Sequence, residues 1–195
     1  MGGVVKALIT LQGVPLISRQ LVALSGAGID EVVVVTGHAQ SAIEEQVRSF
    51  VVTLAHNDAY ADGQQGSVRV GLAALSGPFD AVIIVLADQP LIGAGDLTEL
   101  IGAFKKRSSG HVLVPVVNGQ RGNPIVLDDQ ALALILASDT NLGCRHLIER
   151  QPELVCPYQT PNTRFVTDLD TLEDLKQLAQ GTGWRLELPA LEVAQ

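Results

Sequence analysis

Hydrophobic and polar positions follow one another along this chain in a pattern that predicts strands and helices in turn. Two continuous aliphatic runs, Glu31–Thr36 and Ala81–Leu86, predict strands that are buried on both faces. Apolar residues near helical spacing predict a helix over 15–27, with Pro15 in its first turn. By the same criteria we predict helices over 39–50, 68–75, 94–106, 130–137, 142–150 and 172–179, and strands over 51–55, 112–117, 121–127 and 154–157.

This alternation of strand and helix predicts a single α/β domain whose sheet is mostly parallel and has helices on both faces. Residues 184–195 show no clear pattern, so we expect a domain over 1–180 and a C-terminal tail over 181–195. In such sheets ligands bind beyond the carboxyl ends of the strands. Residues that directly follow strands are therefore the first candidates for chemistry.

Composition narrows the function classes. The 195 residues are 47% hydrophobic, enough for a core without disulfide or metal support. The net charge is −8, and the sequence has one cationic run, Lys105–Arg107. This acidic balance argues against a nucleic-acid partner. No apolar stretch reaches the roughly 20 residues that span a membrane. Cys144 and Cys156 form no CxxC motif, and we expect a soluble cytoplasmic protein with reduced thiols.

Acidic residues follow two of the predicted elements. Asp88 comes after the strand over 81–86, where a carboxylate can hold Mg²⁺ against phosphates; the alternative is a loop residue that caps the next helix or turn. Asp168 and Asp170 flank Leu169, so both point the same way on an extended segment and form a candidate metal pair. The alternative is that Asp170 is the N-cap of the helix that follows.

Three further segments are weaker candidates. Glycines over 57–71 precede and enter a helix, whose backbone amides can meet phosphate, but an ordinary surface loop is an equal alternative. Lys6 is nearly alone in an apolar segment, where a surface lysine is the plainer interpretation. Asn123 either contacts a substrate or satisfies a turn, and Arg145 either pairs with phosphate or lies on a helix surface.

Taken in order, these segments resemble the motifs of one family, the MobA-like nucleotidyltransferases, which include the molybdenum cofactor cytidylyltransferases and guanylyltransferases. The resemblance runs from residue 1 to about 180. The matching segments are 1–16 with its lysine and G-V-P-L, the N-x-x-Y-x-x-G-x-x-x-S-V-R-x-G-L block over 57–72, D-Q-P over 88–90, R-G-N-P over 121–124, the D-x-x-x-G-x-R of 139–145 and D-L-D-T-L-E-D-L over 168–175.

The resemblance implies a three-layer, Rossmann-like nucleotide-diphospho-sugar-transferase (GT-A-like) fold and a Mg²⁺ cofactor. It implies that Lys6 and Asp88 are catalytic and that Asp88, Asp170 and Asp168 supply the metal ligands. The substrate- and nucleotide-binding residues that it implies are Asn57, Gly63, Ser67, Arg69, Gly71, Gln89, Pro90, Gly122, Asn123 and Arg145.

The activity that the resemblance implies is transfer of CMP or GMP from CTP or GTP to a phosphorylated acceptor, molybdopterin in the molybdenum cofactor enzymes, with release of pyrophosphate. A molybdoenzyme or its chaperone is then an expected partner. Three alternatives stay open: a pyrophosphorylase that uses a sugar-1-phosphate, a non-catalytic remnant that binds nucleotide weakly or not at all, and a D-x-D glycosyltransferase.

Two departures from the family pattern stand out. Gln64–Gly66 occupies positions that usually carry Met or Ser. The family also begins with a buried strand and an L-A-A-G-x-S-x-R loop directly ahead of M-G, whereas this sequence starts at Met1-Gly2. We interpret this as a misassigned start codon rather than a true truncation. Without that strand, its neighbours should carry unpaired backbone groups and exposed apolar faces.

Overall fold

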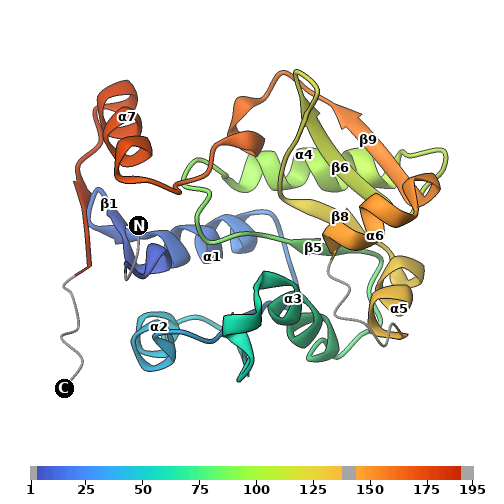
Figure 1. Cartoon of the computed structure of the whole chain (residues 1–195), viewed down its shortest axis with the longest axis horizontal. Helices are drawn as coiled ribbons and strands as arrows, with labels where there is room; N and C mark the ends of the chain where they lie inside the picture. Colours follow the sequence, from blue (N-terminus) through green and yellow to red (C-terminus); the bar gives the residue numbers. More distant parts are fainter. Residues whose placement is uncertain (1–3, 138–143, 190–195) are drawn as a thin grey trace.

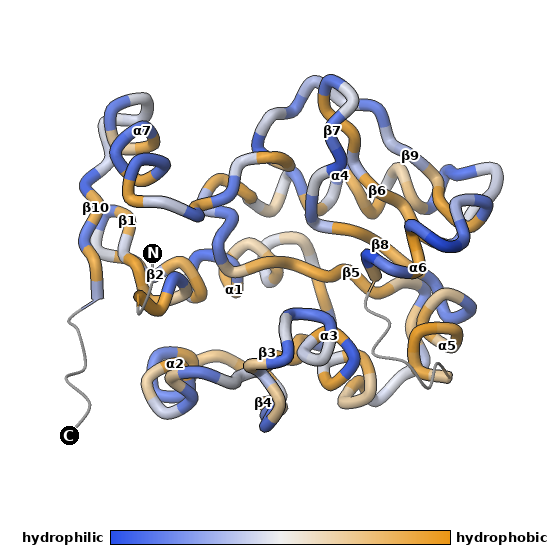
Figure 2. Tube along the Cα trace, viewed as in Figure 1, coloured by the Kyte–Doolittle hydropathy of each residue, from blue (hydrophilic) through white to orange (hydrophobic). Residues whose placement is uncertain are grey.

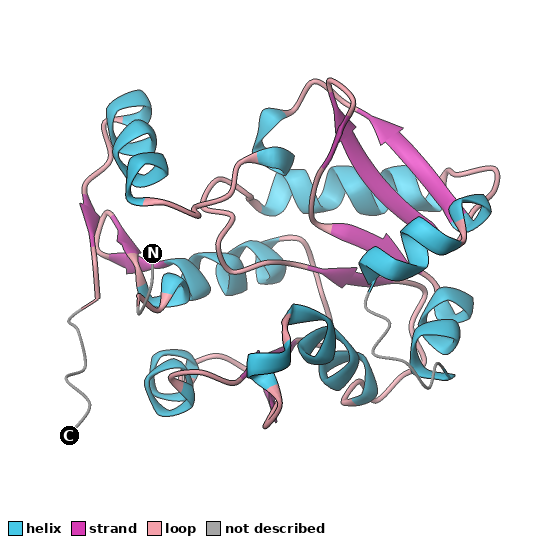
Figure 3. Ribbon diagram, in the orientation of Figure 1, coloured by secondary structure: helices cyan, strands magenta, loops and turns pink. Residues whose placement is uncertain are grey.

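A computed structural model of the chain describes residues 4–137 and 144–189. Seven α-helices in these ranges surround three groups of strands (Figures 1 and 3). Their bounds lie close to the predicted ones, although the helix expected from residue 68 begins four residues earlier. The helices are α1 (Leu16–Gly26), α2 (Gln40–Val47), α3 (Gln64–Ala73), α4 (Ala94–Lys105), α5 (Asp129–Ala137), α6 (Cys144–Arg150) and α7 (Leu172–Thr182).

The largest sheet is mixed, so the expectation of a mostly parallel sheet was wrong. It contains β5 (Val82–Ile84), β8 (Ile125–Leu127), β6 (Val112–Val117), β7 (Gln120–Arg121) and β9 (Val155–Gln159). β9 pairs parallel with β6, whereas β8 runs antiparallel to both β5 and β6. The chain folds straight back from β6 through β7 into β8, and such a short return can build only antiparallel pairs.

Alternate residues of β6 enter two different cores, which makes this part of the molecule layered. Leu113 and Val117 pack in one cluster with residues of α1 and α4, whereas Val112 and Val114 pack in another with residues of α5 and α6. Helices thus cover both faces of the sheet, and the α/β class with a Rossmann-like arrangement is confirmed.

Two smaller sheets complete the fold. β3 (Val33–Thr36) pairs in parallel with β4 (Thr53–His56). β1 (Thr10–Leu11) pairs antiparallel with both β2 (Val14–Pro15) and β10 (Leu186–Glu187). The sequence showed no pattern after residue 183. The structure nevertheless places β10 in this stretch, where it pairs with β1, the first strand of the chain. Strands of two residues leave too short a pattern to be read from sequence.

β3 and β5 come from the two continuous aliphatic runs of the sequence, yet each is paired on one side only. Within the described ranges β3 pairs only with β4, and β5 only with β8. Both are shorter than the predicted runs, and every residue of 81–86 is only half-buried. Figure 2 shows β5 as a continuous hydrophobic stretch.

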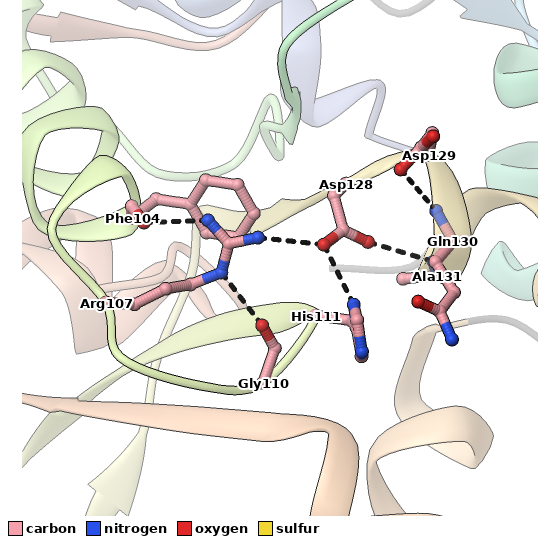
Figure 4. A network of polar contacts seen from close by, with 8 residues as sticks. All are labelled: Phe104, Arg107, Gly110, His111, Asp128, Asp129, Gln130 and Ala131. Atoms are coloured by element: carbon pink, nitrogen blue, oxygen red, sulfur yellow. Dashed lines mark hydrogen bonds and ion pairs between the residues drawn. The ribbon is translucent and has the colours of Figure 1, made fainter.

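A polar network ties the end of α4 to the start of α5 (Figure 4). The Arg107 guanidinium donates to the carbonyls of Phe104 and Gly110, each at 2.8 Å, and to the Asp128 carboxylate at 2.8 Å. It also lies over the Phe104 ring, 3.5 Å from the centroid. Asp128 accepts from the Ala131 amide at 3.1 Å, contacts His111 at 2.9 Å, and so begins α5.

We expect Arg107→Met to lower the free energy of unfolding by about 1–3 kcal/mol at pH 7, because it strands the Asp128 carboxylate, which is 13% exposed. Burial raises the pKa of Asp128, but the Ala131 amide, His111 and Arg107 together hold it below its ordinary value. The stabilisation is therefore present above the ordinary pKa and is lost as the pH falls through the folded-state pKa.

Urea denaturation from pH 3 to 8 measures this effect. Arg48→Met is the matched control, because Arg48 forms an exposed pair with Glu45 whose loss should cost little. Equal losses for the two variants at every pH would contradict the role given to Arg107.

Candidate active site

The candidate site forms where three distant segments meet at the carboxyl end of β5. Asp88 follows this strand, as predicted, and its backbone carbonyl accepts a hydrogen bond from the Leu169 amide at 3.0 Å. Leu169 itself is buried, so the two aspartates that flank it are held beside Asp88. The structure therefore brings together the three carboxylates that the sequence selected.

Lys6 lies between two of these carboxylates. It begins the 3₁₀ helix η1 (Lys6–Leu8), and its Nζ is 2.6 Å from Asp170 Oδ1 and 3.4 Å from Asp88 Oδ2. Burial lowers the pKa of Lys6, but the hydrogen bond to Asp170 and the charges of Asp88 and Asp170 raise it further, so the net shift is upward. Lys6 is thus a fixed cation of the site, not a solvated surface lysine.

Asp168 completes the acidic group from a more buried position. Burial, followed by the negative charge of Asp88, raises the pKa of its carboxyl. One oxygen of Asp168 and one of Asp88 are shielded from solvent and accept no hydrogen bond in the described structure. Partnerless carboxylate oxygens of this kind suit a hard divalent cation such as Mg²⁺.

The alternative capping roles do not hold. Thr171 is the N-cap of α7: its hydroxyl accepts from the Asp174 amide at 3.1 Å, and Asp174 in turn accepts from the Thr171 amide at 2.6 Å. Asp170 is therefore not the cap, and its carboxylate turns to Lys6 instead. α4 likewise begins without Asp88: the Gly93 amide donates to the Asp96 carboxylate at 2.9 Å.

The residues of the site do not by themselves form a complete metal cage. Within residues 4–137 and 144–189, no three His, Cys, Asp or Glu side chains are arranged to hold one ion. Lys6 instead occupies the space between Asp88 and Asp170. A metal here would take the free oxygens of Asp88 and Asp168 and complete its shell with water or with oxygens of a ligand.

A buried group of hydrogen bonds around Gln89 and the Phe165 carbonyl, called the hub below, packs next to the site. Gln89 is fully buried; its side chain donates to the Phe165 carbonyl at 3.2 Å, and its own carbonyl accepts from the side chain of Gln20. The Phe165 carbonyl also accepts from the Asn123 amide at 2.8 Å. Gly122 packs so closely on Phe165 that a side chain there would collide with its backbone. The D-Q-P and R-G-N-P segments thus meet at one carbonyl.

Gln20 and Phe165 were missed by sequence reasoning. Gln20 is 3% exposed and sits four residues after Leu16 on the apolar side of α1. A lone polar residue on a buried helix face was the signal that could have identified it. Phe165 acts through its backbone carbonyl, which no sequence pattern marks. Pro90 is buried beside Gln89.

The loop before α3 is held by its own side chains. Asn57 is 4% exposed; it donates to the Ser67 hydroxyl at 3.0 Å and accepts from the Ala59 amide at 3.1 Å. Gly63 precedes α3 with a φ of +112°, a conformation that favours glycine. Gly71 lets α3 approach β3, because a Cβ there would lie 2.8 Å from Val35. Ser67 and Gly71 line the cavity that opens at Asp88 and Lys6.

Two predicted binding residues point elsewhere. Arg69 donates to the carbonyl of Leu136 at 2.9 Å and so connects α3 to α5. Arg145 lies on α6 with its side chain 81% exposed, pairs with Glu149 at 2.9 Å, and is not among the residues that line the cavity. The rest of its motif, residues 139–143, lies outside the described residues.

Cys144 is buried, which raises the pKa of its thiol to about 12 and disfavours a nucleophilic role.

An α/β domain with an acidic, lysine-bearing site beyond the carboxyl end of β5 is an arrangement that suits nucleotidyl transfer. The family model of the MobA-like NTP transferase domain matches residues 1–155, and the chain belongs to this family.

Curated relatives are similar to this chain over most of its length. The chain is 32% identical over 130 residues to the bifunctional protein GlmU of Pelobacter propionicus and 29% identical over 154 residues to that of Mycobacterium marinum. These matches cover 66% and 74% of the chain but only 28% and 31% of the two relatives.

Solved structures share the fold. A nucleotidyl transferase from Methanothermobacter thermautotroptrophicus superposes with a TM-score of 0.72 at 19% identity, over 90% of this chain and 84% of that one. The manganese complex of Rv0371c from Mycobacterium tuberculosis gives 0.72 at 19% identity, over 90% and 92%. The 4-diphosphocytidyl-2C-methyl-D-erythritol synthase from Anaerococcus prevotii gives 0.72 at 14%, over 89% and 88%. At these identities the likeness concerns the fold alone.

In the part of the chain that the structure describes, no helix combines the length and the apolar character that crossing a bilayer requires.

We expect Asp168→Asn to stabilise the metal-free protein at neutral pH. The raised pKa of Asp168 means that the folded state disfavours the charged form, so the wild type loses stability as the pH rises from the ordinary value of 3.8 through the folded-state pKa. The variant does not titrate there, so its advantage should grow over this range and vanish at lower pH. Denaturant titrations from pH 3 to 8 measure it.

Asp170→Asn is the matched comparison, two residues away on the same segment. It removes the partner of Lys6 at 2.6 Å, so it should bring no stabilisation at any pH. A gain of similar size in both variants would show that removal of any negative charge at the site suffices, and would contradict the burial argument for Asp168.

Proposed function

We propose that this protein transfers a nucleoside monophosphate, CMP or GMP, from the corresponding triphosphate to a phosphorylated acceptor, with release of pyrophosphate. One observation carries the proposal: Lys6, Asp88, Asp168 and Asp170 converge at the carboxyl end of β5, with one oxygen each of Asp88 and Asp168 left without a partner. Membership of the NTP transferase family supports the reaction class.

The chemistry assigned to the site is positioning and charge neutralisation. A phosphate oxygen of the acceptor attacks the α-phosphorus in line, the bond to the β-phosphate oxygen breaks, and pyrophosphate leaves with the electron pair. No covalent enzyme intermediate is required. Mg²⁺ at Asp88 and Asp168, with Asp170 as a further candidate ligand, would neutralise charge on the triphosphate.

Lys6 supplies the protein's own positive charge. Its ammonium is already desolvated and oriented by two carboxylates, so it stays protonated and needs little reorganisation to turn to the leaving phosphates. Ser67 and the backbone near Gly71 line the adjoining cavity, where we place the nucleotide. Gln89, Gly122 and Asn123 shape the site through the hub at Phe165.

Molybdopterin is the acceptor that we propose first, with a molybdoenzyme or its chaperone as recipient of the product. A sugar-1-phosphate is the alternative acceptor that the sequence leaves open. Incubation with each of the four NTPs, Mg²⁺ or Mn²⁺ and each acceptor, followed by measurement of pyrophosphate, separates the two. Absence of both NTP binding and turnover would favour the non-catalytic alternative.

We expect Asp88→Asn to abolish metal-dependent pyrophosphate release and to leave the circular dichroism spectrum unchanged. The matched control is Asp129→Asn, at the exposed first turn of α5, which should retain full activity. Undiminished turnover in Asp88→Asn, measured at saturating metal, would remove Asp88 from the catalytic group.

For Lys6→Met we expect a loss of about 10²- to 10³-fold in kcat, the usual effect of removing one preorganised charge at a transition state. Lys176→Met, on the exposed face of α7, is the control and should be neutral. A change confined to KM would assign Lys6 to ground-state binding of the triphosphate instead.

A further inference from the structure

The stretch of chain between β9 and α7 passes the start of α4 before it reaches the candidate site (Figure 1). It contains the 3₁₀ helix η4 (Thr163–Val166), which carries the Phe165 carbonyl, and it continues to Asp168. Asp88 lies on a different segment, which follows β5 and continues into α4. The separation of these two carboxylates therefore depends on how the two segments are joined.

Three sets of hydrogen bonds join the two segments. Two of them lie close to the site, namely the bond between Leu169 and Asp88 and the hub at Phe165. The third lies at the start of α4, where the Asp96 carboxylate accepts from the Asn162 side chain at 2.7 Å. Contacts that come later on one segment come earlier on the other, so the segments run past each other in opposite directions. The Asp96 contact is the one furthest along the chain from the site.

Asp96 is buried among donors. The residue is 5% exposed, and it accepts from the Gly93 amide at 2.9 Å and from the Asn162 side chain at 2.7 Å. The Arg164 guanidinium lies 3.3 Å from both of its oxygens. A buried, paired carboxylate adds little net stability over an apolar residue of similar size. Its main consequence is therefore the geometry that it imposes on its partners.

Residues 161–164 depend on Asp96 for their attachment. Within the described ranges, every hydrogen bond that these four residues make outside the stretch 160–167 ends on Asp96. The preceding residues are held independently, because β9 pairs with β6 and the Thr160 amide donates to the Val116 carbonyl at 3.1 Å. Without the Asp96 contact, η4 could turn about the hub, and Asp168 would move with it.

We propose that Asp96 is a positioning residue for the acidic site, acting through Asn162. Their hydrogen bond sets how far Asp168 stands from Asp88, and so how well the unpartnered oxygens of these two carboxylates can share a divalent ion. Asp96 is not itself a ligand of that ion. The contact is present in the protein alone, whereas its consequence for the ion rests on the proposed function.

Hydrogen exchange in the metal-free protein tests the contact. Asn162→Asp places a second carboxylate against Asp96, yet its side chain can still accept from the Arg164 amide as Asn162 does. We expect the Leu169 amide, whose bond to Asp88 joins the segments, to exchange roughly tenfold faster, with the amides of β6 unchanged. The double variant Asp96→Asn with Asn162→Asp restores one donor and one acceptor, and should restore slow exchange.

Titration with Mn²⁺ alone, followed by electron paramagnetic resonance, measures the consequence for the ion. Groups that hold metal ligands in place typically change metal affinity by roughly 10- to 100-fold. We therefore expect Asn162→Asp to weaken Mn²⁺ binding by about tenfold and the double variant to restore it. The direction is diagnostic, because the charge of an added carboxylate would by itself strengthen the binding of a cation. A purely structural role would lower the urea midpoint and leave the Mn²⁺ affinity of the folded protein unchanged.

Tyr158→Phe is the matched control. The Tyr158 hydroxyl donates to Glu99 at 3.0 Å, further along α4, but Tyr158 lies in β9, which the sheet holds in place. The variant should lose some stability and leave both the exchange of the Leu169 amide and the Mn²⁺ affinity unchanged. If Asn162→Asp does not fold, Asn162→Ala removes the same donor without an added charge and carries both measurements.

Unchanged exchange of the Leu169 amide in the Asn162 variant would overturn the proposal. Unchanged Mn²⁺ affinity would do the same, as would an effect that the double variant does not reverse. Neither measurement involves nucleotide or turnover. If both effects are found and the wild type transfers no nucleotide, the proposed function fails and this inference stands.

Discussion

The site depends on one pair of ionic contacts, in which the Lys6 ammonium is held between the carboxylates of Asp88 and Asp170. These residues come from the first, middle and last thirds of the chain, and the hydrogen bond from Leu169 to the Asp88 carbonyl fixes two of the segments together. Without the lysine, three carboxylates would face one another with no cation between them, which raises the electrostatic cost of holding the segment before α7 beside Asp88. The cation is thus structural and functional at once.

The same arrangement bears on the ligand charges that the proposed site would accept. Asp168 is held where ionisation is costly, and the cost falls when positive charge arrives. On the proposed function, a divalent ion would neutralise these carboxylates and Lys6 would meet the charge of the phosphates.

Sequence reasoning located the helices, the longer strands and the three carboxylates, because aliphatic runs and residues that follow strands are local signals. It did not find β1, β2 and β10, whose two-residue ladders are too short for a periodic pattern. It assigned a parallel sheet where β8 turns back on β6. At the site it overlooked Gln20 and the Phe165 carbonyl, since both act through tertiary hydrogen bonds that bring together residues far apart in the chain. Arg69 and Arg145 match the motif in type but are engaged with Leu136 and Glu149.

The pairing of β10 with β1 carries a consequence for the ends of the molecule. β1 follows η1 by a single residue, so the strand that β10 holds is connected almost directly to Lys6. The Arg185 amide adds a hydrogen bond to the side chain of Gln12 at 3.1 Å, and the Gln12 amide returns one to the Arg185 carbonyl at 2.8 Å. Proteolytic removal of the residues beyond Gly183 would therefore release the hairpin that anchors the lysine. Limited proteolysis near the carboxyl terminus would thereby change how firmly Lys6, near the amino terminus, is held between the carboxylates.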